Sequence, residues 1–231
     1  MGSSIPARGA NLYMYNLHCH SLLSDGALLP SELAVRYADK GYKVIAITDH
    51  ADYSNIEQVT RGILRFVRKW PRDNCCIRVL PGVELTHLPP QQFRPLVRYA
   101  RGKGIKIIVG HGETSVEPVI KGTNRAALEA GIDILAHPGL ITQDDAALAA
   151  SKGIFLEITS RRGHCDTNPH VVAASVKSGA PLILNTDSHQ PQDIIAPADL
   201  RSVGLHAGLS EDGIGRLYLK AGEFLKGRGI R

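Results

Sequence analysis

The sequence is poor in cysteine and in aromatic residues, and it contains no long apolar run. Its 231 residues include four cysteines, and aromatic side chains make up 5%. Because Cys19, Cys75, Cys76 and Cys165 form no Cys-x-x-Cys motif, the sequence indicates neither a disulfide framework nor a thiolate zinc site. No apolar stretch approaches the roughly 20 residues that span a bilayer, and residues 1–10 lack the apolar segment of a secretory signal. We therefore expect a cytoplasmic protein with reduced thiols and no membrane contact, in which residues 1–10 are a frayed or artificially added end.

The charge of the chain is moderately basic. A net charge of +5 attracts anions, and both phosphorylated metabolites and nucleic acid qualify. A basic but solvated surface explains the same charge equally well, because no dense run of Lys and Arg is present. Aromatic and basic residues also do not alternate in the way that is typical of base-stacking surfaces. The charge alone therefore does not decide between these partners.

Short apolar runs rich in β-branched residues alternate with segments that carry helix signals. Each run is almost continuously apolar, as expected of strands covered on both faces of a parallel sheet. The predicted strands are Leu12–Leu17, Lys43–Thr48, Ile77–Leu85, Ile105–Gly110, Ile132–Ala136, Ile154–Thr159 and Pro181–Asn185. Seven such repeats without a long linker favour one βα barrel spanning residues 1–231, with an open doubly wound sheet as the structural alternative.

Helix boundaries are visible between several of these runs. Residues 30–41 have Ser31 before an acidic first turn and close at Gly41, and residues 121–131 begin near Thr123 or Asn124 and stop at Gly131. Residues 168–179 have Asn168 as a candidate cap, Pro169 at the first helical position and Gly179 past the end. Residues 59–70, which end at Trp70, are expected to cover the barrel. Residues 191–231 are expected to contain helices around Ile194–Leu200 and Glu211–Lys226. These helices are expected to pack on the barrel wall.

Side chains that can bind metals follow six of the seven predicted strands. In a βα barrel, residues from different strand ends converge on the face that carries the active site. A single His or Asp at such a position is more often structural or a helix cap, but His18 and His20 point to one side of an extended chain, and Asp187 and His189 repeat that spacing. The candidate ligands are His18, His20, Asp25, His50, Glu84, His111, His137, Asp187 and His189.

This ligand set predicts more than one metal ion. Imidazole and carboxylate without thiolate suit Zn²⁺, Mn²⁺ or Fe²⁺. A mononuclear site needs only about three or four protein ligands. Nine candidate ligands therefore suggest three divalent ions.

The motifs that carry these residues resemble a known family. In chain order, "HCHSLLSDG", "TDH", "PGVEL", "HG", "HPG" and "TDSH" are similar to the motifs of the PHP (polymerase and histidinol phosphatase) superfamily, and they extend from residue 18 to residue 189. The resemblance implies a distorted (βα)7 TIM-like barrel with a trinuclear metal centre. It implies one ion held by His18, His20, Glu84 and Asp187, a second held by Glu84, His111 and His137, and a third held by Asp25, His50 and His189.

A centre of this kind favours a phosphoryl group as substrate. Bound Zn²⁺ lowers the pKa of water to about 7, so a hydroxide that bridges two ions can form at neutral pH and attack phosphorus in line. Glu84, Asp187 and His189 are accordingly the protein groups that we expect at the reacting centre. No side-chain nucleophile is required.

Four further residues are candidates for substrate binding. Arg161 or Arg162 would clamp a phosphate oxygen through its guanidinium, with only one of the two facing inward; two surface arginines are the alternative. His164 would contact the substrate or protonate a leaving group, unless it is a solvated loop histidine. Glu113 would bind a substrate cation or support the ligands, unless it serves a helix turn.

Other residues of the strand ends have supporting roles at most. Asp49 and Glu157 are candidates for orienting metal-bound imidazoles. Cys19, between two inward histidines, is expected to point into helix packing. His87, His170 and His206 belong to no pattern, so we expect them to be structural or solvated.

The leading functional hypothesis is a metal-dependent phosphatase that acts on a small phosphomonoester, with histidinol phosphate as one candidate. Short segments between strands leave no visible cap domain. A phosphodiesterase or exonuclease that acts on oligonucleotides is the alternative, motivated by the basic charge and by nuclease activity in parts of the superfamily. A non-catalytic metal-binding partner is a third hypothesis, and metal-dependent C–N bond hydrolysis a fourth, although no strand end carries the lysine that carbamylation would need. The sequence leaves the oligomeric state open.

Overall fold

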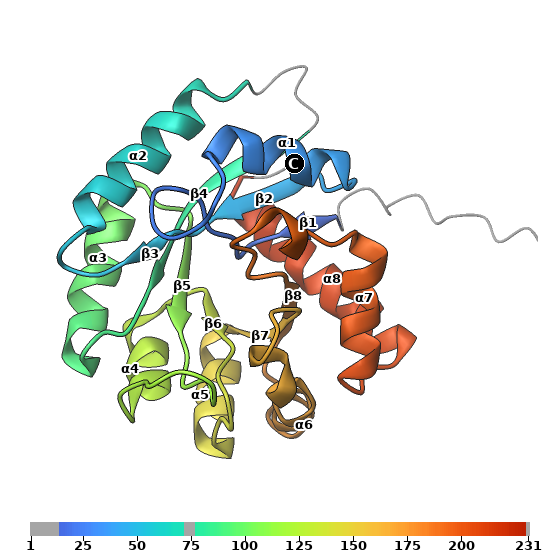
Figure 1. Cartoon of the computed structure of the whole chain (residues 1–231). Helices are drawn as coiled ribbons and strands as arrows, with labels where there is room; N and C mark the ends of the chain where they lie inside the picture. The colour runs from blue at the N-terminus through green and yellow to red at the C-terminus, as the bar shows by residue number, and fades with distance from the viewer. Residues whose placement is uncertain (1–13, 72–76, 230–231) are drawn as a thin grey trace, which may run out of the picture.

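Parallel strands alternate with helices along the whole chain and stand side by side around a nearly closed barrel (Figure 1). The structure is a computed structural model, and it describes residues 14–71 and 77–229. Residues 1–10, Cys75, Cys76 and the first two residues of the predicted strand Leu12–Leu17 lie outside the described residues.

The strands form one parallel sheet in chain order. They are β1 (Tyr15–Asn16), β2 (Val44–Ile47), β3 (His50–Ala51), β4 (Arg78–Leu85), β5 (Ile107–His111), β6 (Ile134–Ala136), β7 (Phe155–Thr159) and β8 (Leu182–Asn185). Their order is β1-β2-β4-β5-β6-β7-β8, with β3 paired to β4. The distorted (βα)7 barrel predicted from the sequence is confirmed, and the open doubly wound alternative is wrong.

Strands β2 and β3 are two halves of one barrel strand. Ile47 of β2 lies opposite Pro81 of β4, and His50 of β3 lies opposite Glu84 in the same register. Glu84 N donates to Asp49 O (3.0 Å), so the backbone hydrogen bonding to β4 continues between the two halves. The strand predicted to end at Thr48 thus resumes at His50, which begins the second half.

The barrel closes between β1 and the segment after β8. Backbone hydrogen bonds run from Asp187 N to His18 O (3.0 Å) and from His20 N to Ser188 O (2.9 Å). Before them, two buried carboxamides take the place of ladder partners: Asn185 Oδ1 accepts from Leu17 N, and Asn16 Oδ1 accepts from Thr186 N (2.8 and 2.7 Å). The distortion thus lies at the seam that carries the first and last ligand motifs.

Eight α-helices within the described residues surround the barrel. They are α1 (Pro30–Asp39), α2 (Ile56–Lys69), α3 (Phe93–Lys103), α4 (Thr123–Ala130), α5 (Gln143–Lys152), α6 (Asn168–Ser178), α7 (Pro197–His206) and α8 (Glu211–Gly227). Short 3-10 turns lie at Pro90–Gln92, His164–Thr167 and Pro191–Asp193. Gly131 and Gly179 follow α4 and α6 with positive φ, as their predicted stop positions require.

Two predicted helix starts are corrected by the structure. Thr167, not Asn168, caps α6, because the Asn168 carboxamide instead accepts from Thr159 N and donates to Thr159 O. The helix predicted around Ile194–Leu200 begins only at Pro197, because a proline disfavours the helical conformation in the residue before it; Ala196 is extended, with ψ 154°.

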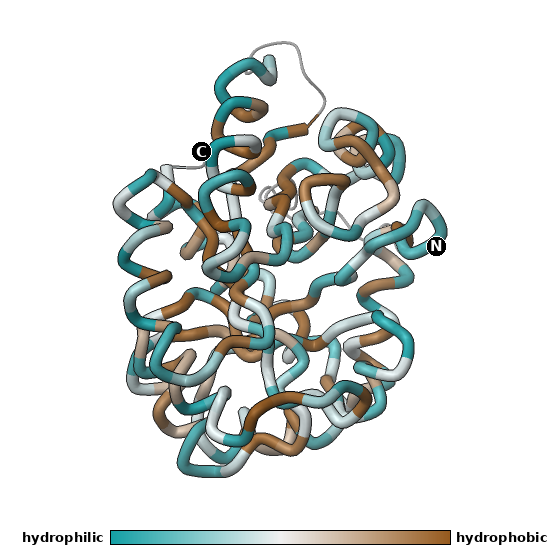
Figure 2. Tube along the Cα trace, turned by 60° about the vertical axis from the view of Figure 1, so that its left-hand side comes forward, coloured by the Kyte–Doolittle hydropathy of each residue, from teal (hydrophilic) through white to brown (hydrophobic). Residues whose placement is uncertain are grey.

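The core lies between the strands and the inner faces of the helices. In Figure 2 the inner strands are mainly hydrophobic, and the surrounding helices alternate between hydrophilic and hydrophobic positions. At the last helix, Phe224 of α8 packs edge-on against Phe155 of β7, with ring centroids 5.3 Å apart. Helix α2 buries Val59 and Ile63 against the barrel. Among the described residues, no helix is long and apolar enough to cross a membrane.

Candidate metal centre

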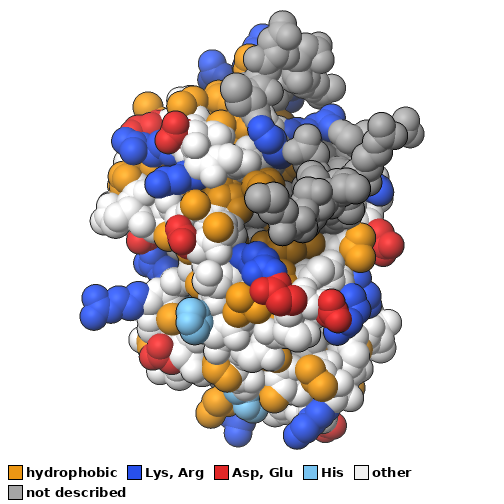
Figure 3. Space-filling view, turned by 90° about the vertical axis from the view of Figure 1, so that its right-hand side faces the viewer, with side chains coloured by type: hydrophobic (Ala, Val, Ile, Leu, Met, Phe, Trp, Pro, Cys, Tyr) orange, Lys and Arg blue, Asp and Glu red, His pale blue; other side chains and the backbone are white. Residues whose placement is uncertain are grey.

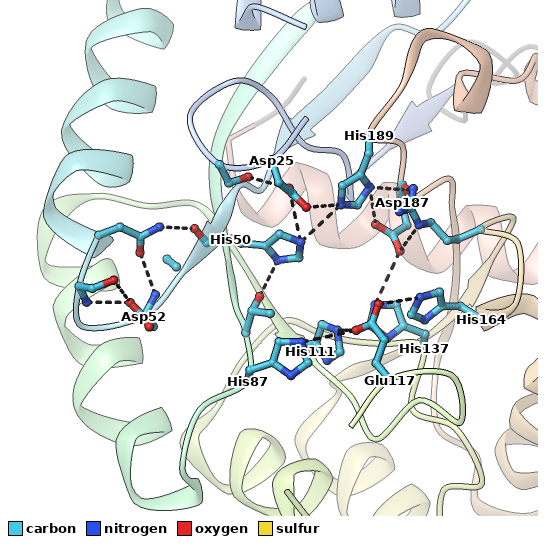
Figure 4. Close-up of a pocket in the computed structure, with 16 residues that line it drawn as sticks. Asp25, His50, Asp52, His87, His111, Glu117, His137, His164, Asp187 and His189 are labelled. Carbon is cyan, nitrogen blue, oxygen red and sulfur yellow. Dashed lines mark hydrogen bonds and ion pairs between the residues drawn. The ribbon is translucent and has the colours of Figure 1, made fainter. Parts of the chain in front are cut away.

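The predicted ligands gather at the mouth of the barrel, at the C-terminal ends of the strands (Figure 4). Since the strands are parallel and neighbours in chain order, residues from six strand ends arrive at one place. His18 and His20 follow β1, His50 begins β3, Glu84 lies near the end of β4, His111 ends β5, His137 follows β6, and Asp187 and His189 follow β8. Asp25 reaches the same mouth from the turn after His20. The structure brings together all nine.

The innermost part of the centre is formed by His18, His20, Glu84 and Asp187. His18 Nε2 lies 3.3 Å from Glu84 Oε2 and 3.5 Å from Asp187 Oδ1. His20 Nε2 lies 3.5 and 3.2 Å from the same two oxygens. All four residues are buried. Two imidazole nitrogens and two carboxylate oxygens therefore surround one point.

Two further groups adjoin this one. His137 Nε2 lies 3.7 Å from Glu84 Oε1, and the rings of His111 and His137 are 4.5 Å apart. Nearer the opening, Asp25 Oδ1 lies 3.6 Å from His50 Nε2, and Asp25 Oδ2 lies 3.4 Å from His189 Nε2. Glu84 and Asp187 are shared: each approaches both His18 and His137.

Several of these buried atoms have no hydrogen-bond partner. They are His18 Nε2, both ring nitrogens of His20, both Glu84 carboxylate oxygens, His137 Nδ1 and Asp187 Oδ1. Leaving a buried polar group unsatisfied costs about 1–3 kcal/mol. So many in one place indicate a missing partner that is small and positively charged. Divalent metal ions fit these nitrogen and oxygen donors.

The protonation states of two candidate ligand histidines also suit metal binding. Burial, followed by the neighbouring charges of His50 and His189, lowers the pKa of His20 well below its ordinary value. Burial and His111 do the same to the pKa of His137. Both rings are therefore neutral, which is the form that binds a metal. Burial raises the pKa of Asp187 to about 6, and although His18 opposes this, the Glu84 carboxylate adds to it.

Two of the ligands have a backbone conformation that side-chain-bearing residues rarely adopt. His137 has φ 28° and Asp187 has φ 52°. Non-glycine residues in this region cost on the order of 1–3 kcal/mol each and cluster at functional sites. The strain points both side chains into the mouth.

Glu157 supports the candidate metal centre through hydrogen bonds to the segments that carry its ligands. This buried carboxylate accepts from His18 Nδ1 (2.8 Å) and Asn185 Nδ2 (2.8 Å) through Oε1, and from His137 N (3.2 Å) through Oε2. It therefore sets the orientation of His18 and the backbone at His137. A carboxylate behind a ligand histidine is the usual supporting arrangement at metal sites.

Asp49 does not orient an imidazole, contrary to the sequence interpretation. Its carboxylate accepts from Ser21 N (2.7 Å), Ser21 Oγ (2.8 Å) and Ser24 Oγ (2.9 Å). These bonds hold the turn that carries Asp25. His50 Nδ1 instead lies 2.6 Å from Thr86 Oγ1 and 2.8 Å from Glu84 Oε2.

The structure separates the four candidate substrate-binding residues. Arg161 lines the mouth, with its Nε 3.9 Å from Asp187 Oδ2, whereas Arg162 is exposed outside it. His164 is buried and lines the mouth, so it is not a solvated loop histidine. Glu113 accepts from Gly122 N (3.0 Å) and Asn124 N (2.9 Å) at the start of α4. Its carboxylate thus serves the helix turn, and we withdraw it as a substrate-binding residue.

Sequence reasoning missed Glu117 and His87. Glu117 Oε2 lies 3.0 Å from His111 Nε2 and 3.5 Å from His87 Nε2, and Glu117 Oε1 lies 3.4 Å from His164 Nε2. The His111 hydrogen bond lowers the pKa of Glu117 to about 2, although partial burial opposes it. Both residues stand in loops without a repeated spacing, so no sequence signal distinguished them.

A third missed residue, Asp193, holds Arg161. Its Oδ2 lies 3.3 Å from Arg161 Nη1 and also accepts from His189 N (3.0 Å) and Gln190 N (2.8 Å). The same oxygen thus fixes the guanidinium and the backbone of a ligand histidine.

The mouth encloses a cavity of about 530 Å³. It is lined by candidate metal ligands and, among them, by Arg161, His164, His87 and Glu117. Fold and site together define a βα-barrel protein with a centre of several ligands for divalent metal ions.

The chain belongs to the PHP domain family, whose profile matches residues 16–135. It is 42% identical over 201 residues to an uncharacterized protein of Methanocaldococcus jannaschii, covering 85% of this chain and 90% of that one. A probable phosphatase of Clostridium acetobutylicum is 26% identical over 204 residues, covering 77% of this chain and 79% of the other.

A solved structure shares the fold. It is the histidinol phosphate phosphatase of Lactococcus lactis in complex with zinc, L-histidinol and phosphate, with a TM-score of 0.60 and 16% sequence identity. The match covers 86% of this chain and 95% of that protein.

Proposed function

We propose that this PHP-family, metal-dependent phosphoesterase hydrolyses a small phosphomonoester. The observation that carries the proposal is the group of buried, unpartnered imidazole and carboxylate atoms beside the guanidinium of Arg161. Bound divalent ions supply an activated water and neutralise the charge of the phosphoryl oxygens.

Three ions, of Zn²⁺, Mn²⁺ or Fe²⁺, would be held by the nine ligands. The first would take His18, His20, Glu84 and Asp187; the second Glu84, His111 and His137; the third Asp25, His50 and His189. The position of Asp25 supports the third group, because its carboxylate approaches both His50 and His189. Glu84 would be shared, since it approaches His18, His137 and also His50.

Other side chains that line the cavity would bind the substrate. Arg161 donates to a phosphate oxygen, and Asp193 keeps its guanidinium in place. His164 lines the cavity with its Nε2 3.4 Å from Glu117 Oε1, and its ring would contact the leaving group. A cavity of about 530 Å³ has the size of a metabolite site.

The relatives support a phosphatase but do not select the substrate. The relative in Clostridium acetobutylicum is named a probable phosphatase. The solved Lactococcus lactis protein acts on histidinol phosphate, and its 16% identity to this chain shows the fold alone. Histidinol phosphate is accordingly the first compound to test in a substrate panel, and we do not propose it as the substrate.

The test is phosphate release from a panel of monoesters and diesters by protein loaded with Mn²⁺ or Zn²⁺, together with elemental analysis. We expect turnover of monoesters, about three metal equivalents per chain, and loss of both activity and metal in His20→Ala. Release at background level from every monoester by fully loaded protein would refute the proposal and favour a non-catalytic metal-binding role.

The second candidate is an oligonucleotide phosphodiesterase or exonuclease. It is favoured by the concentration of positive charge on α2 and α3, beside the mouth. Single-stranded oligonucleotides that remain intact under conditions in which monoesters are cleaved would exclude it.

A further inference from the structure

Helices α2 and α3 carry a positive charge balance that is larger than the net charge of the whole protein. Together they contain eight Lys or Arg residues and one acidic residue, Glu57, a balance of +7. The whole chain has a net charge of +5, so the remainder has a balance of −2. The two helices lie side by side on the outside of the barrel (Figure 1). The excess of positive over negative charge is therefore concentrated on these two helices, although no basic run is visible in the sequence.

The opposite side of the molecule is different. Figure 3 shows the face over α7 and α8, where basic and acidic side chains are interspersed. There, Arg201 of α7 is paired with Glu211 of α8. Charge on that face is neutralised locally, as in an ordinary solvated surface.

A groove of about 500 Å³ runs between α2 and α3. Arg61, Arg65 and Arg68 of α2 line one wall, and Tyr99 and Lys103 of α3 line the other. Residues spaced by four and three positions lie on one side of a helix, so the three arginines form a row about 10 Å long. None of them forms an ion pair with a carboxylate among the residues that the structure describes.

The chemistry of this groove favours phosphates over other anionic surfaces. Guanidinium groups suit phosphate oxygens. A membrane-binding helix needs large apolar side chains beside its charges, and a protein interface needs an apolar core. None of the exposed large apolar side chains of the described residues belongs to α2 or α3, and Leu64 and Tyr99, which line the groove, are both partly buried.

We propose that the α2–α3 groove binds the phosphate backbone of a single-stranded nucleic acid. One end of the groove lies close to the catalytic cavity. Asn55 lines the catalytic cavity and Glu57, two residues later, lines the groove. A strand in the groove thus has one end beside the metal centre, and the binding is independent of which ester the centre cleaves.

The test compares two variants of the full chain with equal loss of charge. One is Arg61→Gln/Arg65→Gln/Arg68→Gln in the groove. The other is Arg216→Gln/Lys220→Gln/Lys226→Gln, on exposed positions of α8. Binding of a fluorescein-labelled single-stranded oligouridylate is followed by anisotropy at several salt concentrations, with EDTA present to prevent cleavage.

We expect the groove variant to bind at least about tenfold more weakly at low salt. Loss of three phosphate contacts also lowers the slope of log K against log salt concentration by about 2. The α8 variant should bind like the unmodified protein, and Glu57→Gln should bind more tightly. Thermal unfolding and monoester hydrolysis should be unchanged in the groove variant, since none of its residues reaches the metal centre.

Three results would overturn the proposal. The first is an unmodified protein that does not bind the oligonucleotide even at low salt. Equal weakening in the groove and α8 variants would show an effect of net charge alone. Displacement of the RNA by polyglutamate as effectively as by unlabelled RNA would show a surface for polyanions in general. Failure of the phosphatase assay would affect none of these readouts.

Discussion

Replacing Glu157 by glutamine should weaken the metal centre without removing any ligand. Glu157 is completely buried, and its two oxygens accept three hydrogen bonds: from His18 Nδ1, Asn185 Nδ2 and His137 N. Burial lowers the pKa of His18, but the carboxylates of Glu157, Asp187 and Glu84 together raise it well above its ordinary value. The Glu157 charge therefore polarises His18 as well as orienting it.

The expected magnitude follows from this geometry. A glutamine can keep its oxygen toward His18 and Asn185, but its amide group then faces the N–H of His137, which is also a donor. One buried hydrogen bond to a charged acceptor is lost, worth about 1.5–3 kcal/mol. Loss of a supporting carboxylate typically reduces metal affinity by about 10–100-fold, equivalent to about 1.4–2.7 kcal/mol. Both effects should appear, because Glu157 supports two ligand segments.

Two assays separate the effects. Competition with a chromophoric chelator measures metal affinity, and urea unfolding of the metal-free protein measures stability. The exposed Glu223→Gln substitution on α8 is the matched control and should change neither. If Glu157→Gln retained unmodified metal affinity while folding normally, the assignment of Glu157 as the support of His18 would be wrong.

Three other perturbations have defined outcomes. Gly139→Ala should destabilise the protein by at least about 2 kcal/mol in urea unfolding, because the residue has φ 61° and a Cβ there would collide with Glu113 O. Gly153→Ala, where φ is 65° and the space is open, should cost only about 1 kcal/mol, and equal costs in the two variants would contradict this reasoning. Metal affinity, measured by calorimetry, should fall as the pH falls through about 6, the pKa of Asp187, because at lower pH its carboxyl group must lose a proton before it can bind the ion. An affinity that does not change with pH would show that Asp187 is not a ligand. Arg161→Lys should raise KM for a phosphomonoester roughly tenfold, since a bidentate donor to the phosphate is lost. Arg162→Lys, at an exposed position, is the control and should leave KM unchanged; equal KM values in both variants would show that Arg161 does not bind the phosphate.

Local patterns were sufficient to predict the barrel and a set of candidate metal ligands that the structure brings to one mouth. Continuous apolar runs mark strands buried on both faces, and parallel strands in chain order must present their C-terminal ends together. His18, Glu84 and Asp187 could therefore be assigned to one place although they are far apart in the chain. The single strand predicted at Lys43–Thr48 shows the limit, because its continuation at His50 is visible only in the pairing with β4.

Loop residues could not be assigned in this way. Glu113 and Glu117 are four residues apart and chemically alike, but the first caps α4 and the second faces the cavity among three histidines. No periodicity applies in a loop, so only the path of the chain decides where each carboxylate points. The same is true of Arg161 and Arg162.

The sequence by itself determined the alternation of strands and helices, the parallel barrel and the nine candidate ligands, because these follow from local periodicity and from position at strand ends. Only the tertiary structure decided which arginine faces the centre, that Glu157 supports it, and that α2 and α3 form a basic groove. Those features depend on side chains from distant segments meeting in space, and their contacts are set by packing rather than by spacing along the chain.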